Sequence, residues 1–393
     1  MSTQGISEII GSSIDDYVAI RRDLHAHPEL KYSEYRTASV VRHKLSELGI
    51  PVVADLAGTG LVAALRRGTS AKSLGLRADM DALAIEETSG RPYSSSVPGV
   101  MHACGHDGHV ATLLCAADYL ARYSKFDGTV YFVFQPAEEG GAGAKRMIED
   151  GLFERCPMDA IYALHNWPGL PSGDIAVSEG GVMASTNDFE ITLEGPGGHV
   201  AFPHRSADLV GLACHMIERI RRIRLERIDP MNPITLAVTT FDGGTTVNAF
   251  PTQVRLRGTV RAFDTSVVDR VESGIELLVR AAAHEPNVTA SLIFERKYPA
   301  TLNWAAGVGA VRQAAVETVG ADRVHRQTPA MTSEDFAFML EEVEGAYFFL
   351  GNGDGGKESK PLHSTTYDFD DDALPTGAIV LARLVEQQLA PQT

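Results

Sequence analysis

The sequence predicts an α/β domain that is interrupted by a smaller α+β domain of the ferredoxin-like type. In the outer parts of the 393-residue chain, short apolar runs alternate with helical stretches, as in a parallel sheet covered on both faces. In the middle, apolar and polar residues alternate, which is typical of strands with one exposed face. We therefore expect residues 1–182 and 299–393 to form the larger domain and residues 183–298 the smaller one.

The larger domain is expected to open with helices around residues 14–24 and 41–48, because apolar residues recur there every three or four positions. Gly49 follows the second helix, where glycine commonly ends one. Strands and helices then alternate. The predicted strands are residues 74–76, 130–134, 160–164 and 346–350. The predicted helices are residues 110–123 and 375–389.

In the smaller domain, four half-buried strands and two helices are expected. The predicted strands are residues 189–193, 234–238, 254–260 and 288–294. Helical stripes at residues 210–220 and 268–278 follow the first and third of these strands. The resulting β-α-β-β-α-β order is that of the ferredoxin-like unit.

Composition excludes several classes of protein. Lys and Arg number 35 against 51 Asp and Glu, and the formal charge of −16 repels nucleic acids and anionic membranes. No run of about 18 apolar residues predicts a membrane span. The first residues do not form a signal-peptide pattern, and the four cysteines have no regular spacing. We therefore expect a cytoplasmic protein with free thiols.

The segment Met-His-Ala-Cys-Gly-His-Asp-Gly-His at residues 101–109 places four ligand-type side chains in one loop ahead of a predicted helix. Imidazole and thiolate are metal ligands, although an isolated stretch of this kind is as often a surface histidine cluster. Glu138 and Glu139 directly follow the predicted strand 130–134. In extended chain their side chains point to opposite sides, so that one carboxylate can bind metal while the other faces a substrate. This division of labour suits metal-assisted hydrolysis.

Two further histidines give weaker signals. His165 follows the predicted strand 160–164, at the carboxyl end where open α/β sheets place their sites. A single histidine there is more often a core residue than a ligand. His363 precedes the final predicted helix and is uninformative by itself.

Seven ordered motifs resemble the hippurate hydrolase branch of the co-catalytic metallopeptidase and aminoacylase family, from about residue 14 to the last helix. The motifs are RRDLHAHPEL at 21–30, RADMDAL at 77–83, HACGHDGH at 102–109, QPAEEG at 135–140, GGH at 197–199, VNAFP at 247–251 and TSEDF at 332–336. The resemblance implies a zinc-peptidase-like, metal-binding catalytic domain. It also implies that the inserted ferredoxin-like domain is a lid through which two chains dimerise.

The resemblance implies a role for individual residues as well. The positions that match ligands of a two-metal site are Cys104, His106, Glu139, His165 and His363. Glu138 matches the catalytic base, and His199 matches a histidine that reaches the substrate carbonyl, often from the partner subunit. Asn248 and Arg261 match lid positions that hold the substrate. For Arg261, pairing with a substrate carboxylate and an ordinary surface position remain open alternatives.

One departure concerns the metals. Most relatives carry a metal-binding histidine where this chain has Arg77, while here Cys104 is present and His165 replaces a common carboxylate. These replacements are typical of the hippurate branch. Two divalent ions are expected, with Mn²⁺ or Zn²⁺ first and Ni²⁺ or Co²⁺ as alternatives, since thiolate and imidazole suit zinc whereas carboxylate also admits manganese.

The expected activity is hydrolysis of the amide bond of an N-acyl amino acid to a carboxylic acid and a free amino acid. We expect Glu138 to act as general base and His199 to stabilise the oxyanion. A dipeptidase or an N-acetyl-amino-acid deacetylase, such as one acting on N-acetyldiaminopimelate, is the alternative within enzymes. A metal-stabilised binding protein without catalysis is the alternative outside them. The expected partners are this small substrate and a second copy of the chain, with neither nucleic acid nor membrane.

Overall fold

The computed structural model of the chain describes residues 3–353 and 360–391. The chain divides into two compact units. The larger unit comprises Met1–Val182, Leu302–Thr328 and Asp335–Thr393. The smaller one comprises Met183–Thr301 and Pro329–Glu334. Residues 299–301 and 329–334, which the sequence prediction assigned to the larger domain, thus group with the smaller unit.

The larger unit is built on an eight-stranded sheet in the order β1-β2-β4-β3-β5-β16-β6-β15. Its strands are β1 (Val52–Leu56), β2 (Gly60–Arg67), β3 (Ser73–Asp79), β4 (Gly128–Gln135), β5 (Ala160–Trp167), β6 (Ile175–Ala176), β15 (Val324–His325) and β16 (Gly345–Gly351). The central strands β4, β3, β5 and β16 are parallel to one another. They are the four predicted strands, and they are almost wholly buried, as their continuous apolar runs indicate.

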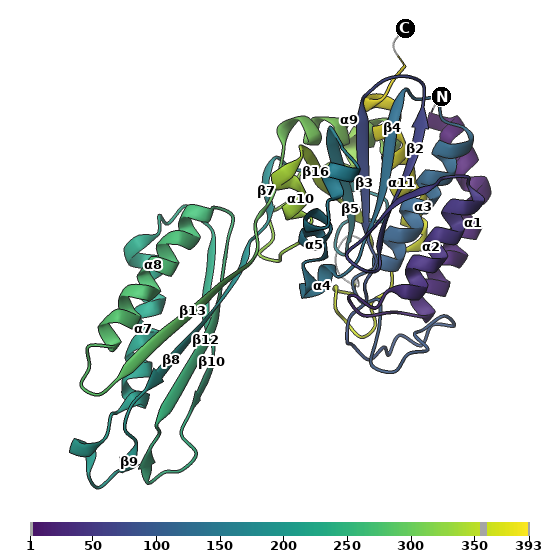
Figure 1. Cartoon of the computed structure of the whole chain (residues 1–393). Helices are drawn as coiled ribbons and strands as arrows, with labels where there is room; N and C mark the ends of the chain where they lie inside the picture. Colours follow the sequence, from purple (N-terminus) through teal and green to yellow (C-terminus); the bar gives the residue numbers. More distant parts are fainter. Residues whose placement is uncertain (1–2, 354–359, 392–393) are drawn as a thin grey trace. The chain divides into compact units, whose positions relative to one another are not determined.

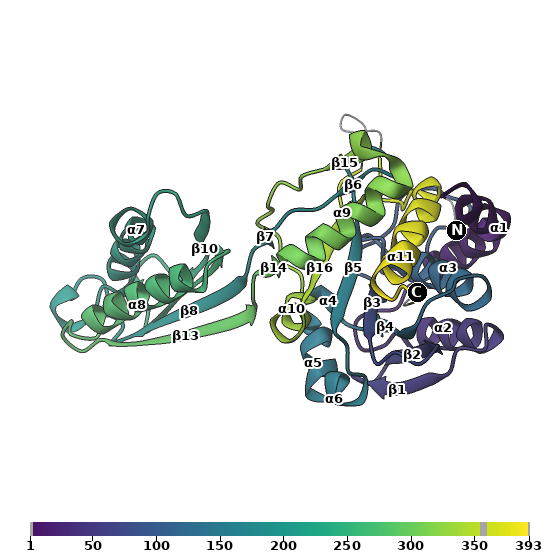
Figure 2. The ribbon, with the colours of Figure 1, turned by 90° about the horizontal axis from the view of Figure 1, so that it is seen from above.

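Helices cover both faces of this sheet, as Figure 2 shows. The helices of the larger unit are α1 (Thr3–Ala26), α2 (Tyr35–Glu47), α3 (His106–Arg122), α4 (Glu138–Gly141), α5 (Gly143–Glu149), α6 (Leu152–Arg155), α9 (Ala305–Val319), α10 (Ala337–Glu342) and α11 (Leu374–Gln388). On one face, α2, α3, α9 and α11 pack on the strands, and α1 packs outside α3 and α11. On the other face lie α5, α6 and α10. The main core therefore fills the space between the sheet and the α3–α11 layer.

The smaller unit has a four-stranded antiparallel sheet in the order β10-β12-β8-β13. Its elements are β8 (Thr186–Glu194), α7 (Leu209–Arg227), β10 (Ile234–Gly243), β12 (Gln253–Ala262), α8 (Thr265–Ala282) and β13 (Thr289–Tyr298). This is the predicted β-α-β-β-α-β order. Both helices lie on one face of the sheet, where they enclose a separate core (Figure 1). The short strands β9 (Gly198–His199) and β11 (Ala249–Phe250) form an additional pair.

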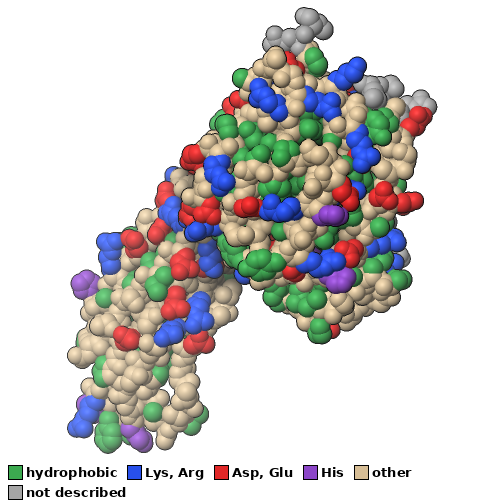
Figure 3. All heavy atoms as spheres, turned by 45° about the vertical axis from the view of Figure 1, so that its right-hand side comes forward, with side chains coloured by type: hydrophobic (Ala, Val, Ile, Leu, Met, Phe, Trp, Pro, Cys, Tyr) green, Lys and Arg blue, Asp and Glu red, His purple; other side chains and the backbone are tan. Residues whose placement is uncertain are grey.

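The chain connects the two units through β7 (Gly180–Met183) and β14 (Thr301–Asn303). Short 3-10 helices lie at Pro203–Arg205, Ala321–Arg323 and Asp371–Ala373. All four cysteines are free, as predicted. No helix of the described residues has the length and apolar character needed to cross a lipid bilayer. On the face shown in Figure 3, Lys and Arg side chains are interspersed with Asp and Glu.

Candidate metal centre

The five predicted ligands converge at the carboxyl-terminal edge of β4 and β5 in the larger unit. They come from the loop ahead of α3 and its first residue, from the turn after β4, from β5 and from the loop ahead of α11. Their donor atoms form overlapping groups in which all atoms lie within 4.8 Å of one another. These groups are Cys104 with His106 and His165, Cys104 with Glu139 and His363, and His106 with Glu138 and Glu139.

The histidine rings are oriented by hydrogen bonds from the nitrogen that does not face the centre. Nδ1 of His165 donates to the carbonyl oxygen of Asn166 at 2.7 Å, and its Nε2 lies 3.5 Å from Sγ of Cys104. Nδ1 of His106 donates to the carbonyl oxygen of Asp81 at 2.8 Å. Hydrogen bonds of this kind fix ring orientation and leave the other nitrogen available to a metal.

An unpaired imidazole nitrogen indicates that the centre is built for a cation. Nε2 of His106 is buried without a hydrogen-bond partner, which is costly unless another species binds it. Oε1 of Glu139 lies 3.2 Å from Nε2 of His363, which places a carboxylate and a second imidazole at the same centre. Together with the soft thiol and the carboxylate, these donors fit divalent transition metals.

The charges around the centre lead to the same conclusion. Burial, followed by the carboxylates of Glu139 and Glu138, raises the pKa of the Cys104 thiol well above its usual value. Burial alone would lower the pKa of His106, but Asp79 and Asp81 outweigh it and raise that pKa to about 10. The site therefore concentrates negative charge, which a bound cation offsets while displacing protons.

The turn that carries Glu138 and Glu139 corrects one sequence expectation. We expected extended chain here, whereas the structure has a short helical turn, α4, with a kink at Glu139 (φ −70°, ψ 75°). Ala137 before this turn and Ala142 after it have left-handed backbone, and so does Gly140 within it. Glu138 is buried, and its Oε1 accepts a 3.4 Å hydrogen bond from the backbone nitrogen of Asp335.

Buried polar residues surround the ligands. The carboxylate of Asp79 accepts hydrogen bonds from Nδ1 of His109 at 2.6 Å and from Nη1 of Arg77 at 2.8 Å. The Arg77 guanidinium also contacts Gln135 and Asp335 at 2.8 and 3.3 Å. Arg77 thus provides a fixed positive charge behind the centre.

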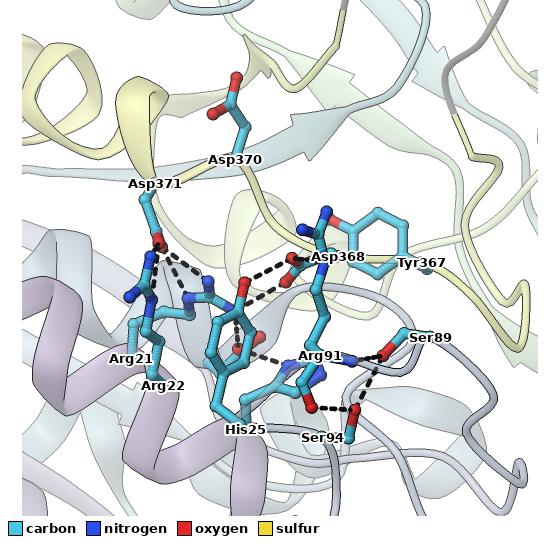
Figure 4. A network of polar contacts seen from close by, with 12 residues as sticks. Arg21, Arg22, His25, Ser89, Arg91, Ser94, Tyr367, Asp368, Asp370 and Asp371 are labelled. Carbon is cyan, nitrogen blue, oxygen red and sulfur yellow. Dashed lines mark hydrogen bonds and ion pairs between the residues drawn. The ribbon is translucent and has the colours of Figure 1, made fainter.

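A second polar network connects α1 to two of the ligand-bearing segments (Figure 4). Arg21 donates from Nε to Asp371 and from Nη1 to Asp368, each at 2.8 Å, in the segment that follows His363. Its Nη1 also lies 3.5 Å from Oδ2 of Asp107, the neighbour of His106. α1 therefore holds together two segments that are far apart in sequence.

The three remaining predicted residues lie in the smaller unit. His199 and Asn248 are close to each other, because β9 pairs with β11 and the nitrogen of Val200 donates to the carbonyl oxygen of Asn248 at 3.1 Å. Both side chains are exposed. Arg261 lies on β12, where its half-buried guanidinium donates to the carbonyl oxygen of Met331 at 3.1 Å. The structure therefore brings His199 and Asn248 close together and places Arg261 on another strand.

Sequence reasoning missed the acidic residues behind the ligands, above all Asp81 and Asp335. Both lie in motifs quoted above, and Asp81 stands two positions after Asp79, the last residue of the buried strand β3. Two aspartates spaced two positions apart just after a predicted strand were the sequence signal that could have identified them. Their contacts with Gln135, Glu138 and Glu139 join distant segments and could not be inferred from spacing.

Comparison with known proteins gives consistent matches. Residues 75–387 match the sequence model of peptidase family M20/M25/M40. The hippurate hydrolase of Campylobacter jejuni is 36% identical over 375 residues, covering 95% of this chain and 97% of the relative. The N-acetyl-L-cysteine deacetylase of Bacillus subtilis is 35% identical over 358 residues, covering 91% of this chain and 84% of the relative. The solved structure of the Bacillus subtilis YXEP protein, described as a dinuclear metal binding peptidase from the M20 family, matches with a TM-score of 0.85. It is 29% identical and covers 97% of this chain and 99% of its own.

Proposed function

This chain belongs to peptidase family M20/M25/M40, and on that premise we propose that it is a metal-dependent amidohydrolase that cleaves N-acyl amino acids. The products are a carboxylic acid and a free amino acid. The observation that carries the proposal is the convergence of five ligand-type side chains beside the buried Glu138, at the carboxyl edge of the sheet. Two similar proteins support the substrate class, because hippurate and N-acetyl-L-cysteine, which their names specify, are both N-acyl amino acids.

We propose that Cys104, His106, Glu139, His165 and His363 would hold two divalent ions. Their donor atoms form two groups with Cys104 in common, one with His106 and His165 and one with Glu139 and His363. The thiol and imidazoles favour Zn²⁺, while the carboxylate also admits Mn²⁺, with Co²⁺ and Ni²⁺ as further candidates. When bound, such ions polarise an amide carbonyl and make a water molecule acidic near neutral pH.

The remaining steps are assigned to the chain's own groups. Glu138 takes the proton from the attacking water and passes it to the amine nitrogen as the amide bond breaks. Hydrogen bonds of its backbone nitrogen with Asp81 and of its side chain with Asp335 hold Glu138 beside Glu139. His199 stabilises the oxyanion, and Asn248 and Arg261 hold the substrate.

We further propose a homodimer formed through the smaller unit, with His199 supplied to the partner's centre. His199 and Asn248 lie on an exposed two-stranded element, and exposed polar groups of this kind suit contact with a substrate outside their own unit. Light scattering of the purified protein should give twice the chain mass. Mixing a Glu138→Gln variant with a His199→Ala variant should restore activity only when the two chains exchange into one dimer.

The substrate proposal is tested with metal-stripped protein that is reloaded with Mn²⁺, Zn²⁺, Co²⁺ or Ni²⁺ in turn. Release of free amine is measured on hippurate, N-acetyl amino acids including N-acetyldiaminopimelate, and dipeptides. We expect turnover of N-acyl amino acids with at least one metal and slower turnover of dipeptides. Preferred cleavage of dipeptides would reassign the substrate class. A fully loaded protein that cleaves none of them would overturn the proposal.

A further inference from the structure

The turn from Ala137 to Ala142 has a backbone that most side chains avoid. Ala137 and Ala142 have φ angles of +56° and +54°, and Gly140 between them has +71°. A left-handed conformation is unfavourable for an L-residue such as alanine, because its Cβ approaches the following carbonyl oxygen. Such a turn persists only where the surrounding structure holds it in place. This turn carries both Glu138 and Glu139.

Carboxylates from distant segments hold the turn and the start of α5 by accepting backbone N–H groups. Oε1 of Glu34 accepts from Ala137 at 2.9 Å, and Oδ2 of Asp335 accepts from Ala144 at 2.9 Å. Asp81 makes the central contact, because its Oδ1 accepts from the nitrogen of Glu138 at 3.0 Å and its Oδ2 from that of Glu139 at 2.9 Å. Hydrogen bonds with an ionised acceptor are roughly twice as strong as neutral ones.

Asp81 is also connected to a ligand on the other side of the centre. Its carbonyl oxygen accepts the 2.8 Å hydrogen bond from Nδ1 of His106. Asp81 itself is buried, with 1% of its surface exposed, and the next residue is fixed because the nitrogen of Ala82 donates to the carbonyl oxygen of Glu29 at 2.8 Å. One rigid residue thus touches the base, the carboxylate ligand and one imidazole ligand.

We propose that Asp81 is a positioning residue that sets the placement of Glu138, Glu139 and His106 relative to one another. It acts through these residues and contacts neither substrate nor metal. The inference rests on the proposed hydrolytic function and adds a requirement to it: the separation between the base and two ligands is fixed by a single side chain and its carbonyl. An asparagine there would keep one acceptor oxygen and turn an N–H donor toward the other amide.

The test compares Asp81→Asn with Asp127→Asn as a matched control. Oδ1 of Asp127 accepts from two successive backbone nitrogens, those of Thr69 and Ser70, at 2.6 and 2.7 Å. Asp127 precedes β4 and Glu138 follows it, so the control neutralises a carboxylate that also accepts two backbone N–H groups, at the opposite end of the same strand.

We expect Asp81→Asn to weaken binding of Zn²⁺ and Mn²⁺ about 10- to 100-fold in competition with a chelator. At saturating metal, kcat should fall at least tenfold while KM changes less than twofold. Asp127→Asn should keep wild-type metal affinity and kcat, even if its melting temperature falls as much as that of Asp81→Asn. Wild-type metal affinity in Asp81→Asn, or an equal loss of metal affinity in Asp81→Asn and Asp127→Asn, would overturn the proposal.

A milder variant covers the case in which Asp81→Asn does not fold. Asp81→Ser removes the carboxylate and leaves a hydroxyl whose hydrogen can rotate away from both amides. It should show smaller losses of metal affinity and kcat than Asp81→Asn. Unchanged metal affinity in Asp81→Ser would also contradict the assignment. Because metal affinity is measured without substrate, it tests Asp81 even if the wild-type protein hydrolyses no N-acyl amino acid, and the two proposals fail separately.

Discussion

At the scale of single residues, Glu138 is the group on which the proposed chemistry depends most. Glutamine has the same shape but cannot accept a proton, so Glu138→Gln should lower kcat about 10²- to 10⁴-fold. Its metal content should stay at the wild-type level, because the neighbouring Glu139 is the proposed ligand. Steady-state kinetics with metal analysis of the same samples checks both expectations. Normal turnover would remove Glu138 as the base, and lost metal would make it a ligand.

A variant of Arg261 can show whether this residue binds substrate or has only a structural role. If its guanidinium pairs with the substrate carboxylate, Arg261→Ala should raise KM about tenfold or more, since charge-assisted pairs are strong. Arg257 on the same strand pairs with Glu190 at 2.8 Å and provides the control. Arg257→Ala should leave KM unchanged. An unchanged KM for Arg261→Ala would mean that Arg261 serves the contact with Met331 alone.

His25 should make stability depend on pH. Burial alone would lower its pKa, but the carboxylate of Asp107 at 2.9 Å outweighs burial and raises the pKa from 6.5 to about 10. A raised pKa in the folded state stabilises the protein fully below pH 6.5, and this contribution is lost as the pH rises towards 10. The loss is at most several kcal/mol, at about 1.4 kcal/mol per pKa unit.

Denaturant unfolding between pH 6 and 10 measures this contribution. The free energy of unfolding of the wild type should fall more steeply with pH than that of His25→Gln, which cannot take up a proton. Parallel curves for the two proteins would show that His25 does not carry the charge.

At the scale of helices and strands, prediction succeeded where burial follows a regular pattern along the element. The strands β3, β4, β5 and β16 were found because both of their faces are covered and their apolar runs are continuous. β2 and α9 were missed, since the alanines of β2 weaken its strand signal and the small residues of α9 weaken its helical stripe. The kinked α4 turn was also missed, because contacts with Glu34, Asp81 and Asp335 impose it from outside.

The start of α3 gives a prediction at this scale. Gly105 stands between Cys104 and His106 with φ +90°, and an added Cβ would lie 2.4 Å from Nδ2 of Asn166 and 2.6 Å from the hydroxyl of Tyr367. Gly105→Ala should therefore displace both ligands, lower metal occupancy and cost roughly 1–3 kcal/mol of stability.

Gly11→Ala in α1 is the matched control, because nothing lies within 4 Å of an added Cβ there. It should stabilise the helix by about 0.5–1 kcal/mol and keep full metal content. Metal analysis and thermal melts of the two variants provide the comparison. Full metal content in Gly105→Ala would show that the loop tolerates the change.

At the scale of the whole molecule, the sequence could supply the proposed ligands but not the groups behind them. The motifs single out Cys104, His106 and Glu139 as candidates from residue type and order. Asp335, by contrast, reaches Gln135 across 200 positions of sequence, and only the folded chain brings the two together. Local patterns report burial and backbone preference, whereas such contacts depend on how distant segments pack.

The two units have separate cores, which predicts how the molecule responds to metal removal. A metal that binds only the folded larger unit stabilises that unit by mass action. Calorimetry should therefore show two unfolding transitions, and a chelator should lower the temperature of one by several degrees while leaving the other in place.

A substitution in the smaller unit identifies the second transition. Leu256 is fully buried there, and Leu256→Ala should cost about 2–5 kcal/mol and shift the transition that the chelator leaves unchanged. Equal shifts of both transitions on chelation would show that the two cores unfold as one.

The network around Arg21 also bears on how the protein matures in the cell. Asp371, which pairs with Arg21, lies 350 positions later in the chain. A ribosome must therefore add nearly all of the described sequence before this buried guanidinium acquires its full set of counter-charges. Until then Asp107 supplies part of the counter-charge, and the contacts that join α1 to the segment after His363 are among the last to form in biogenesis.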